Sequence, residues 1–570
     1  MPKANRPADI VLIMSDQHNA HVMGCSGNAV ARTPAIDALA RGGTQFTAAY
    51  CPCPLCVPSR MAFMTARYPA DVDVWDNDST LRSDIPTFAH ALADGGCEPV
   101  LCGRMHFYGR DQFHGFERRL YGDSGHALSR EICGAGYNRT NGQTRYAVEV
   151  AGYGRTGFEA YDEAVTAKAI EFIRKRGGES SGGGGRGGRR PLCLVVGYTL
   201  PHNPLICSRR WFDYYMDRIA EPPPETPEEF ARQNIAIRKW RERRGADKIT
   251  PAQARRATAA YYGLVSEMDQ NIARLVEAAR SAPGGDRTVV IYTSDHGDMC
   301  GEHGMWWKSC YFEGSARVPL IFNGQAIAAG RTVEAVVSLI DVGPTVLEMM
   351  GCPPMKSVAG RSLARFLAGD ASVGGAPSPA MHDCGMGVSP VRPAGVSPAE
   401  PAAGTAARRA GQRPTPHTEP SAERGGVPSG NAPSPADWPN EILCDYHGAH
   451  GDKPSCMIRR GDWKLMYYWE FDTYLLFNLR EDPGELRDRA ADPSCRDIAA
   501  SLLATIRSRW SAQRVLENQG KEGDQGTTAG MTFPHEVIDP TFPAEDNQFD
   551  FSQLPWWGEV RERVRKDTRK

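Results

Sequence analysis

The sequence predicts an α/β fold in which helices sandwich a large mixed, mainly parallel sheet, followed by a smaller C-terminal α+β domain that carries an antiparallel sheet. Two observations predict this fold class. In the first part of the chain, four continuous aliphatic runs alternate with stretches of helical periodicity, and such runs are typical of strands that are covered on both faces. In the last part, short runs separated by Gly and Asp turns indicate an antiparallel meander.

The elements of the first part follow one another in a regular order. Residues 10–14 are the first aliphatic strand, and residues 33–43 indicate a helix with Thr33 as N-cap, proline in its first turn and glycine after its end. The same pattern of helix and glycine recurs at residues 84–96, whereas residues 107–160 have weak periodicity and are expected to be loops. Further strands are expected at residues 44–48, 99–102, 191–198 and 288–292, and further helices at residues 161–176, 251–282 and 341–350.

Two stretches are too poor in apolar side chains to form a core. Residues 177–190 (GGESSGGGGRGGRR) predict a flexible surface insertion, and residues 371–438, rich in Ala, Pro, Gly, Ser and Thr, predict a disordered linker or insertion. We therefore divide the chain into a large domain at residues 1–370, the linker, and a C-terminal domain with a tail at residues 439–570.

The C-terminal domain combines four short strands with one helix. A helix is expected over residues 494–515, with Ser494 as its N-cap. The aromatic run near the end of the polar tail could dock on the body of the protein or on a second subunit, which leaves a homo-oligomer open. The strands are expected near residues 441–446, 455–459, 463–468 and 474–478, and the apolar helix face comprises Ile498, Leu502, Ile506 and Trp510.

Charge and hydropathy exclude several classes of partner. The 570 residues carry a formal net charge of −2, from 66 Lys and Arg against 68 Asp and Glu, so no global field favours nucleic acid or an anionic membrane. The apolar run at residues 10–14 is too short for a signal peptide, and no stretch approaches the ~18 apolar residues that span a bilayer. We therefore expect a cytoplasmic protein, in which the sixteen cysteines are reduced thiols rather than a disulfide framework.

Chemically active residues follow each of the four aliphatic strands. Asp16, the pair Arg104 and His106, His202, and the pair Asp295 and His296 all come within a few residues of a strand end. In an open parallel sheet, such residues meet in the crevice outside the carboxyl ends of the strands. The sequence therefore predicts one site that binds a metal or an anion.

Cys56 lies where a loop leads into a helix. Pro58 has the φ angle of a first helical turn, and the residues after it contain no helix breaker. The N–H groups at a helix N-terminus favour a thiolate or another anion, and Arg60, one turn on, can reach the same point. The alternative is a metal or disulfide cluster formed by the run CPCPLC, in which Cys51 and Cys53 precede Cys56.

Asp16, Gln17, Asp295 and His296 offer two carboxylates, an amide oxygen and an imidazole, a set suited to a divalent cation. Taken singly, each has a structural alternative, since an aspartate after a strand is often a helix cap.

The run Cys56-Val57-Pro58-Ser59-Arg60 resembles the signature of type I sulfatases, which belong to the alkaline phosphatase superfamily. The resemblance extends to DIVLIMSDQHNAHVMGCSGNAVARTPAIDALARGGTQFTAAY, MAFMTARYP, TSDHGD and GSARVPLIF, and spans most of residues 9–370. WDNDSTLRSDIPTFAHALADGG and CGRMHFYGRDQFHGFERRL resemble the branch of choline sulfatases and phosphonate monoester hydrolases. One departure is Thr65-Ala66-Arg67, where family members commonly carry Thr-Gly-Arg.

This resemblance implies that residues 1–370 are a catalytic domain and that a formylglycine-generating enzyme oxidises Cys56 to formylglycine. It implies a cation, calcium or alternatively manganese, at Asp16, Gln17, Cys56, Asp295 and His296. The implied catalytic residues are Cys56, Arg60, Arg104, His106, His202 and Lys308.

The implied reaction is hydrolysis of a small-molecule or saccharide sulfate ester with release of inorganic sulfate. Two alternatives stay open. One is a phosphonate or phosphate ester hydrolase on the same fold, and the other is an unmodified homologue that binds an anion without catalysis.

Overall fold

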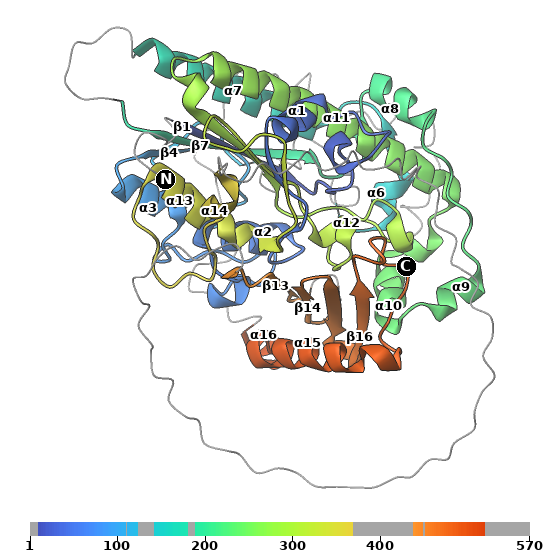
Figure 1. Ribbon diagram of the computed structural model, residues 1–570. Coiled ribbons are helices and arrows are strands. Elements are labelled where there is room, and N and C mark those ends of the chain that lie inside the picture. Colours follow the sequence, from blue (N-terminus) through green and yellow to red (C-terminus); the bar gives the residue numbers. More distant parts are fainter. Residues whose placement is uncertain are drawn as a thin grey trace, which may run out of the picture.

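An eight-stranded sheet forms the centre of the computed structural model (Figure 1), which describes residues 9–109, 111–123, 142–179, 189–368, 437–448 and 451–518. Its order is β11-β2-β10-β9-β1-β7-β4-β5. The strands other than β10 run in one direction, and β10 pairs antiparallel with both of its neighbours. The strands are β1 (Asp9–Asp16), β2 (Gly43–Phe46), β4 (Glu98–Gly103), β5 (Arg118–Arg119), β7 (Leu192–Pro201), β9 (Thr288–Ser294), β10 (Leu320–Asn323) and β11 (Arg331–Val333).

The four predicted aliphatic strands are the four central neighbours β9, β1, β7 and β4. Every residue of β1, β7 and β9 is buried, because helices cover both faces of the sheet. This confirms the inference from continuous aliphatic runs, since a strand with one solvent-exposed face would show alternating apolar and polar residues.

Helices cover the two faces of the sheet in separate layers (Figure 1). On one face lie α1 (Pro34–Arg41), α7 (Gly157–Glu179) and α11 (Pro251–Ser281), and on the other lie α2 (Cys56–Thr65), α3 (Phe88–Asp94) and α13 (Val342–Met350). The remaining elements of this domain are α6 (Arg145–Glu149), α8 (Arg209–Met216), α9 (Pro227–Arg232), α10 (Ile235–Arg244), α12 (Glu313–Ala316) and α14 (Ala364–Leu367), with the ladders β3 (Ala49–Tyr50) with β12 (Val337–Ser338) and β6 (Gly152–Tyr153) with β8 (Ile206–Cys207).

The C-terminal domain contains the predicted antiparallel meander. Its sheet has the order β13 (Glu441–Tyr446), β14 (Ser455–Arg460), β15 (Trp463–Tyr468) and β16 (Thr473–Asn478), and α15 (Arg496–Arg509) packs beneath it (Figure 1). The fold class predicted from the sequence is therefore confirmed for both domains.

The single C-terminal helix with Ser494 as N-cap is wrong in detail. Trp510 has extended backbone angles (φ −136°, ψ 142°) and separates α15 from α16 (Ala512–Asn518). Cys495 is the N-cap of α15, while Ser494 donates its backbone N–H to Asp492. The shift arises because residues Pro493–Cys495 form a short 3₁₀ turn, so Ser494 lies inside that turn and the α-helix begins only after it.

Several other predicted boundaries change. The helix predicted over residues 84–96 is α3, which begins at Phe88 after its N-cap Thr87. Residues 107–160 are not all loop, since α6 lies within them and α7 begins at Gly157 instead of residue 161. α7 also continues to Glu179, into the predicted insertion. The second predicted strand is β2, which ends at Phe46 and not at residue 48.

The rest of the predicted insertion at residues 180–188, the linker at residues 369–436 and the tail from residue 519 lie outside the described residues. Trp438, at the end of the predicted linker, packs its ring against Phe366 of α14.

Two polar contacts fix the C-terminal sheet on the large domain. Lys464 of β15 is fully buried and places its Nζ 2.8 Å from both Glu313 of α12 and Glu485. Asp445 of β13 donates its backbone N–H to the carbonyl of Pro52, which lies in the loop before Cys56. The C-terminal sheet therefore supports the segment that carries Cys56.

None of the helices within the described ranges is long and apolar enough to cross a bilayer. The cysteines of those ranges are all free thiols, and most of them are buried.

Candidate active site

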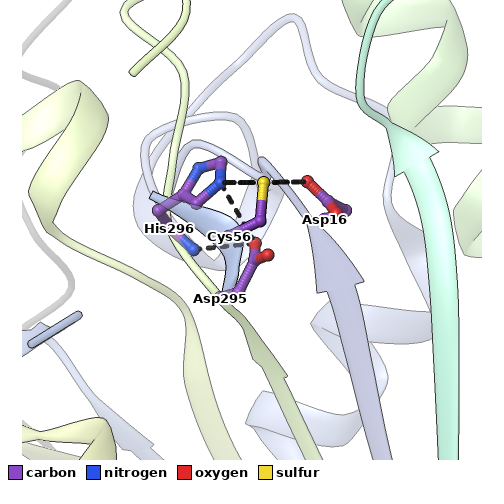
Figure 2. A group of neighbouring side chains, drawn as sticks. All are labelled: Asp16, Cys56, Asp295 and His296. Atoms are coloured by element: carbon purple, nitrogen blue, oxygen red, sulfur yellow. Dashed lines mark hydrogen bonds and ion pairs between the residues drawn. The ribbon is translucent and has the colours of Figure 1, made fainter. Parts of the chain in front are cut away.

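The predicted residues meet at the carboxyl ends of the central strands. Asp16 ends β1, Arg104 follows β4, His202 follows β7 and Asp295 follows β9. These strands are direct neighbours in the sheet, so their ends form one continuous crevice floor. Cys56, from the N-terminus of α2, lies against them (Figure 2).

Cys56 is the first residue of α2, as its sequence context predicts. Leu55 is the N-cap and provides no side-chain cap, whereas Asn77 accepts a hydrogen bond from the backbone N–H of Val57 at 3.0 Å. The Sγ atom is buried and lies 3.1 Å from Lys308 Nζ, 3.1 Å from His296 Nε2 and 3.7 Å from Asp16 Oδ1. The helix N-terminus and Lys308 both favour negative charge at this position.

Asp16, Cys56, Asp295 and His296 each offer one ligand atom, and these atoms lie within 4.8 Å of one another (Figure 2). All four residues are buried. Cys51 and Cys53 do not belong to this group, so the alternative of a cluster built from the CPCPLC run has no support among the residues that the structure describes.

The chemical state of these groups fits a divalent cation. Burial alone would raise the pKa of Asp16, but the positive charges of Arg104, Arg60 and Lys308 outweigh it and hold that pKa well below its usual value. Burial lowers the pKa of His296, so its ring is neutral. The His296 Nδ1–H donates to the Gly297 carbonyl at 3.0 Å, which leaves a lone pair on the Nε2 atom that faces Cys56.

Arg60 balances the two buried carboxylates. Its side chain is fully buried and donates from Nε to Asp295 Oδ2 at 2.8 Å and from Nη2 to Asp16 Oδ2 at 3.2 Å. Burial alone would lower the pKa of Arg60, but the two aspartates raise it, so the guanidinium stays charged. A buried charge of this kind is stable only when it is paired in this way.

The Gln17 side chain links three neighbours. Its Oε1 accepts from Lys308 Nζ at 2.7 Å, and its Nε2 donates to Asp298 Oδ2 at 2.5 Å and to Asn203 Oδ1 at 3.2 Å. Its backbone N–H donates to Asp295 Oδ1 at 3.1 Å, with φ at 71°. In this arrangement, the amide oxygen that the sequence suggested as a metal ligand faces Lys308.

Arg104 and His106 form a second contact pair. Arg104 donates from Nε to Asp16 Oδ2 at 2.6 Å and from Nη2 to His106 Nδ1 at 3.0 Å. The backbone of Arg104 packs directly on Gly197 of β7, where an added Cβ would meet the Arg104 carbonyl oxygen at 1.7 Å, so only glycine fits there. His106 Nε2 lies 3.0 Å from the Tyr108 hydroxyl, and Asp123 accepts the His106 backbone N–H.

His202 and Lys308 form a third pair beside Cys56. Lys308 Nζ lies 2.8 Å from His202 Nε2, while His202 Nδ1 donates to the Asn203 carbonyl at 2.7 Å. Burial and the nearby Lys308 charge lower the pKa of His202, so Lys308 is the donor in this hydrogen bond. The pair therefore holds a proton directly beside the Cys56 sulfur.

Sequence reasoning missed four residues of this site. Asp298 and Asn203 hold the Gln17 amide, and each stands within two positions of a predicted residue, in the motifs TSDHGD and LPHNP. Tyr108 likewise follows His106 by two positions. Asp123, which binds the backbone of Met105 and His106, lies in a loop without any sequence signal.

Comparisons with known proteins agree with this geometry. Residues 8–352 match the family model described as Sulfatase. The chain is 31% identical to a choline-sulfatase of Rhizobium meliloti (strain 1021) over 369 residues, which cover 60% of this chain and 67% of the relative. It is 23% identical to arylsulfatase K of Xenopus laevis, over 85% of this chain and 80% of the relative.

Among solved structures, the phosphonate monoester hydrolase of Silicibacter pomeroyi superposes with a TM-score of 0.62 at 19% identity, covering 90% of this chain and 96% of that one. At this identity, the likeness shows a shared fold. Together with the family match over more than half of the chain, these findings show that the protein is an enzyme of the sulfatase family, within the alkaline phosphatase superfamily.

Proposed function

We propose that the protein is a sulfuric ester hydrolase that releases inorganic sulfate through a formylglycine at position 56, made from Cys56 by a formylglycine-generating enzyme, with the help of a divalent cation. The observation that carries the proposal is the position of the Cys56 sulfur, within 3.7 Å of a carboxylate, an imidazole and an ammonium group at a helix N-terminus. A small-molecule or saccharide sulfate ester is the proposed substrate.

The first step is attack on sulfur. The hydrated aldehyde at position 56 carries two hydroxyl groups. One of them gives its proton to the carboxylate of Asp16, whose Oδ1 lies 3.7 Å from the Cys56 sulfur, and its oxygen forms a new bond to the sulfur of the ester while the bond from that sulfur to the ester oxygen breaks. The departing alcohol oxygen takes a proton from Lys308 or His202, which lie 2.8 Å apart beside residue 56. Arg60 and Arg104 would stabilise the charge on the sulfate oxygens.

The second step releases sulfate. His106, whose ring contacts Arg104 and Tyr108, takes the proton of the second hydroxyl. The carbon–oxygen double bond of the aldehyde then forms again, and the bond from carbon to the sulfate oxygen breaks. Sulfate leaves without any water attacking sulfur.

We further propose that Asp16, Asp295 and His296, with Gln17 and residue 56, hold the cation. Calcium suits the carboxylates and the amide, and manganese is the alternative. When bound, the cation would withdraw charge from the sulfate oxygens. Asp16 and Asp295 would supply the negative charge, while Gln17 would offer only a neutral oxygen that now accepts from Lys308.

Metal affinity should therefore depend on the aspartates more than on Gln17. Asp295→Asn keeps the shape of the side chain but removes its charge, and we expect calcium affinity to fall at least about tenfold, whereas Gln17→Ala has a smaller effect. Equilibrium dialysis with metal analysis measures both, with the surface variant Asp71→Asn as control. Loss of the ion in Gln17→Ala with retention in Asp295→Asn would show that the site lies elsewhere.

A substrate panel tests the function itself. Protein produced together with a formylglycine-generating enzyme should release sulfate from aryl and alkyl sulfate esters, and Cys56→Ala should release none. The shared fold with a phosphonate monoester hydrolase makes phosphonate monoesters the necessary comparison. A higher kcat/KM on phosphonate monoesters than on every sulfate ester would favour that alternative instead.

A further inference from the structure

The backbone on both sides of Lys308 has an unusual conformation. Trp307 and Ser309 have φ angles of 61° and 65°, in the left-handed region that residues with side chains rarely adopt. Such conformations persist only where the surroundings hold them, and they gather at functional sites. Trp307 is held by Asp298, whose Oδ1 accepts the Trp307 backbone N–H at 3.1 Å. Because Ser309 directly follows Lys308, the contacts that hold Ser309 also fix the backbone of Lys308.

Residues from four separate segments hold Ser309. We call these four residues, Pro54, Gln143, Trp240 and Tyr446, the Ser309 clasp. The Ser309 backbone N–H donates to the Pro54 carbonyl at 3.0 Å, and the Ser309 carbonyl accepts from Trp240 Nε1 of α10 at 2.9 Å. Its hydroxyl accepts from Gln143 Nε2 at 2.9 Å and also contacts the hydroxyl of Tyr446 on β13. All of these partner residues are buried, and Ser309 itself is 3% exposed.

Arg244 fixes the orientation of the Gln143 amide. Its Nε donates to Gln143 Oε1 at 3.3 Å, so the amide NH₂ group of Gln143 must face Ser309. The guanidinium also binds both oxygens of Asp452 in the C-terminal domain, at 3.2 and 2.5 Å, and lies over the Trp240 ring at 4.2 Å. Arg244 is only 3% exposed, which is rare for arginine outside a specific role.

We propose that Arg244, paired with Asp452, is a positioning residue that acts through Gln143 and Ser309 to hold the Lys308 ammonium beside residue 56. The inference rests on the proposed function, in which Lys308 or its neighbour His202 protonates the departing alcohol. Lys308 must satisfy Gln17, His202 and residue 56 at once with a flexible four-carbon chain. A displacement of about 1 Å in a reacting group can cost about 100-fold in rate, so the anchoring of its backbone matters.

The same chain of contacts gives the C-terminal domain a part in catalysis. Asp452 and Tyr446 both belong to that domain. Tyr446 is part of the Ser309 clasp, and Asp452 reaches the clasp through Arg244. Docking of the C-terminal sheet thereby completes the support of Lys308. Within the described residues, this sheet acts on the site without a direct contact to Cys56.

Two variants test the proposal. Gln143→Met keeps the length of the side chain but removes both of its hydrogen bonds, and it leaves Arg244 paired with Asp452. Arg244→Met removes the guanidinium but also takes away a buried partner of Asp452. If Arg244→Met does not fold, Gln143→Met alone decides the test. Lys239→Ala is the matched control, because Lys239 lies on the same helix and pairs with Glu242 at the surface.

We expect Gln143→Met to lower kcat about 10- to 100-fold on alkyl sulfates, whose alcohols leave poorly, and less than about threefold on nitrophenyl sulfate, with KM and calcium content unchanged. A purely structural role would lower kcat equally on both esters. Equal losses, or kcat values like those of the wild type and Lys239→Ala on both esters, would overturn the inference and leave the proposed function intact. A wild-type protein that hydrolyses no sulfate ester would instead overturn the proposed function and this inference with it.

Discussion

His106→Ala should release one equivalent of alcohol per site in a burst and then stop, with sulfate still bound to residue 56. In the proposed reaction, the first step does not use His106, because Lys308 and His202 supply the proton beside residue 56, whereas His106 contacts Arg104 and Tyr108. The second step needs a base for the remaining hydroxyl, and loss of such a base typically slows a step about 10²- to 10⁴-fold. Steady-state turnover should fall by that factor.

A single-turnover experiment measures this directly. Alcohol release is followed over time, the reaction is quenched with acid, and the peptide that contains residue 56 is examined by mass spectrometry for bound sulfate. His21→Ala is the control, because His21 lies outside the site, with its Nδ1 3.6 Å from Glu302 Oε1. If alcohol and sulfate appeared together at a uniformly reduced rate, His106 would not be the base of the second step.

Lys308→Met should slow the first step and abolish the burst. The variant keeps the length of the side chain but removes the ammonium that lies 2.8 Å from His202 and 3.1 Å from the Cys56 sulfur. We expect a loss of about 10²- to 10⁴-fold for alkyl sulfates and less than about tenfold for nitrophenyl sulfate, because a phenolate leaves without a proton.

The dependence on the leaving group separates this role from simple binding. Lys453→Met, a substitution at an exposed lysine of the C-terminal domain, serves as the control for loss of a positive charge. An equal loss on both esters, carried by KM, would mean that Lys308 only binds the sulfate group.

The sequence predicts the central sheet well because burial on both faces leaves a direct signal. β1 and β9 are continuous aliphatic runs, and their positions match the prediction within two residues. The segment between residues 205 and 250 gave no such signal, although it forms α8, α9 and α10. In α10, the buried residues include Arg241 and Arg244, so charged side chains occupy positions where an apolar pattern would be expected.

In the candidate site, too, some residues could be placed from the sequence and others could not. Asp16 and Asp295 could be placed because each directly follows or ends a buried strand, and parallel strands bring their ends together. The role of Gln17 could not be predicted from the sequence, since the direction of its amide depends on Asp298 and Asn203, which come from two other segments. The support of Lys308 by Gln143 and Arg244 is likewise a tertiary arrangement that no local pattern reveals.

The most direct test of the whole account is the chemical identity of residue 56 in the active protein. Full-length enzyme that hydrolyses sulfate esters is digested, and the peptide containing position 56 is analysed by mass spectrometry with and without a reagent that traps aldehydes. The account predicts an aldehyde at position 56 in proportion to the measured activity. A fully active preparation in which that residue is only the unmodified Cys56 thiol would contradict it.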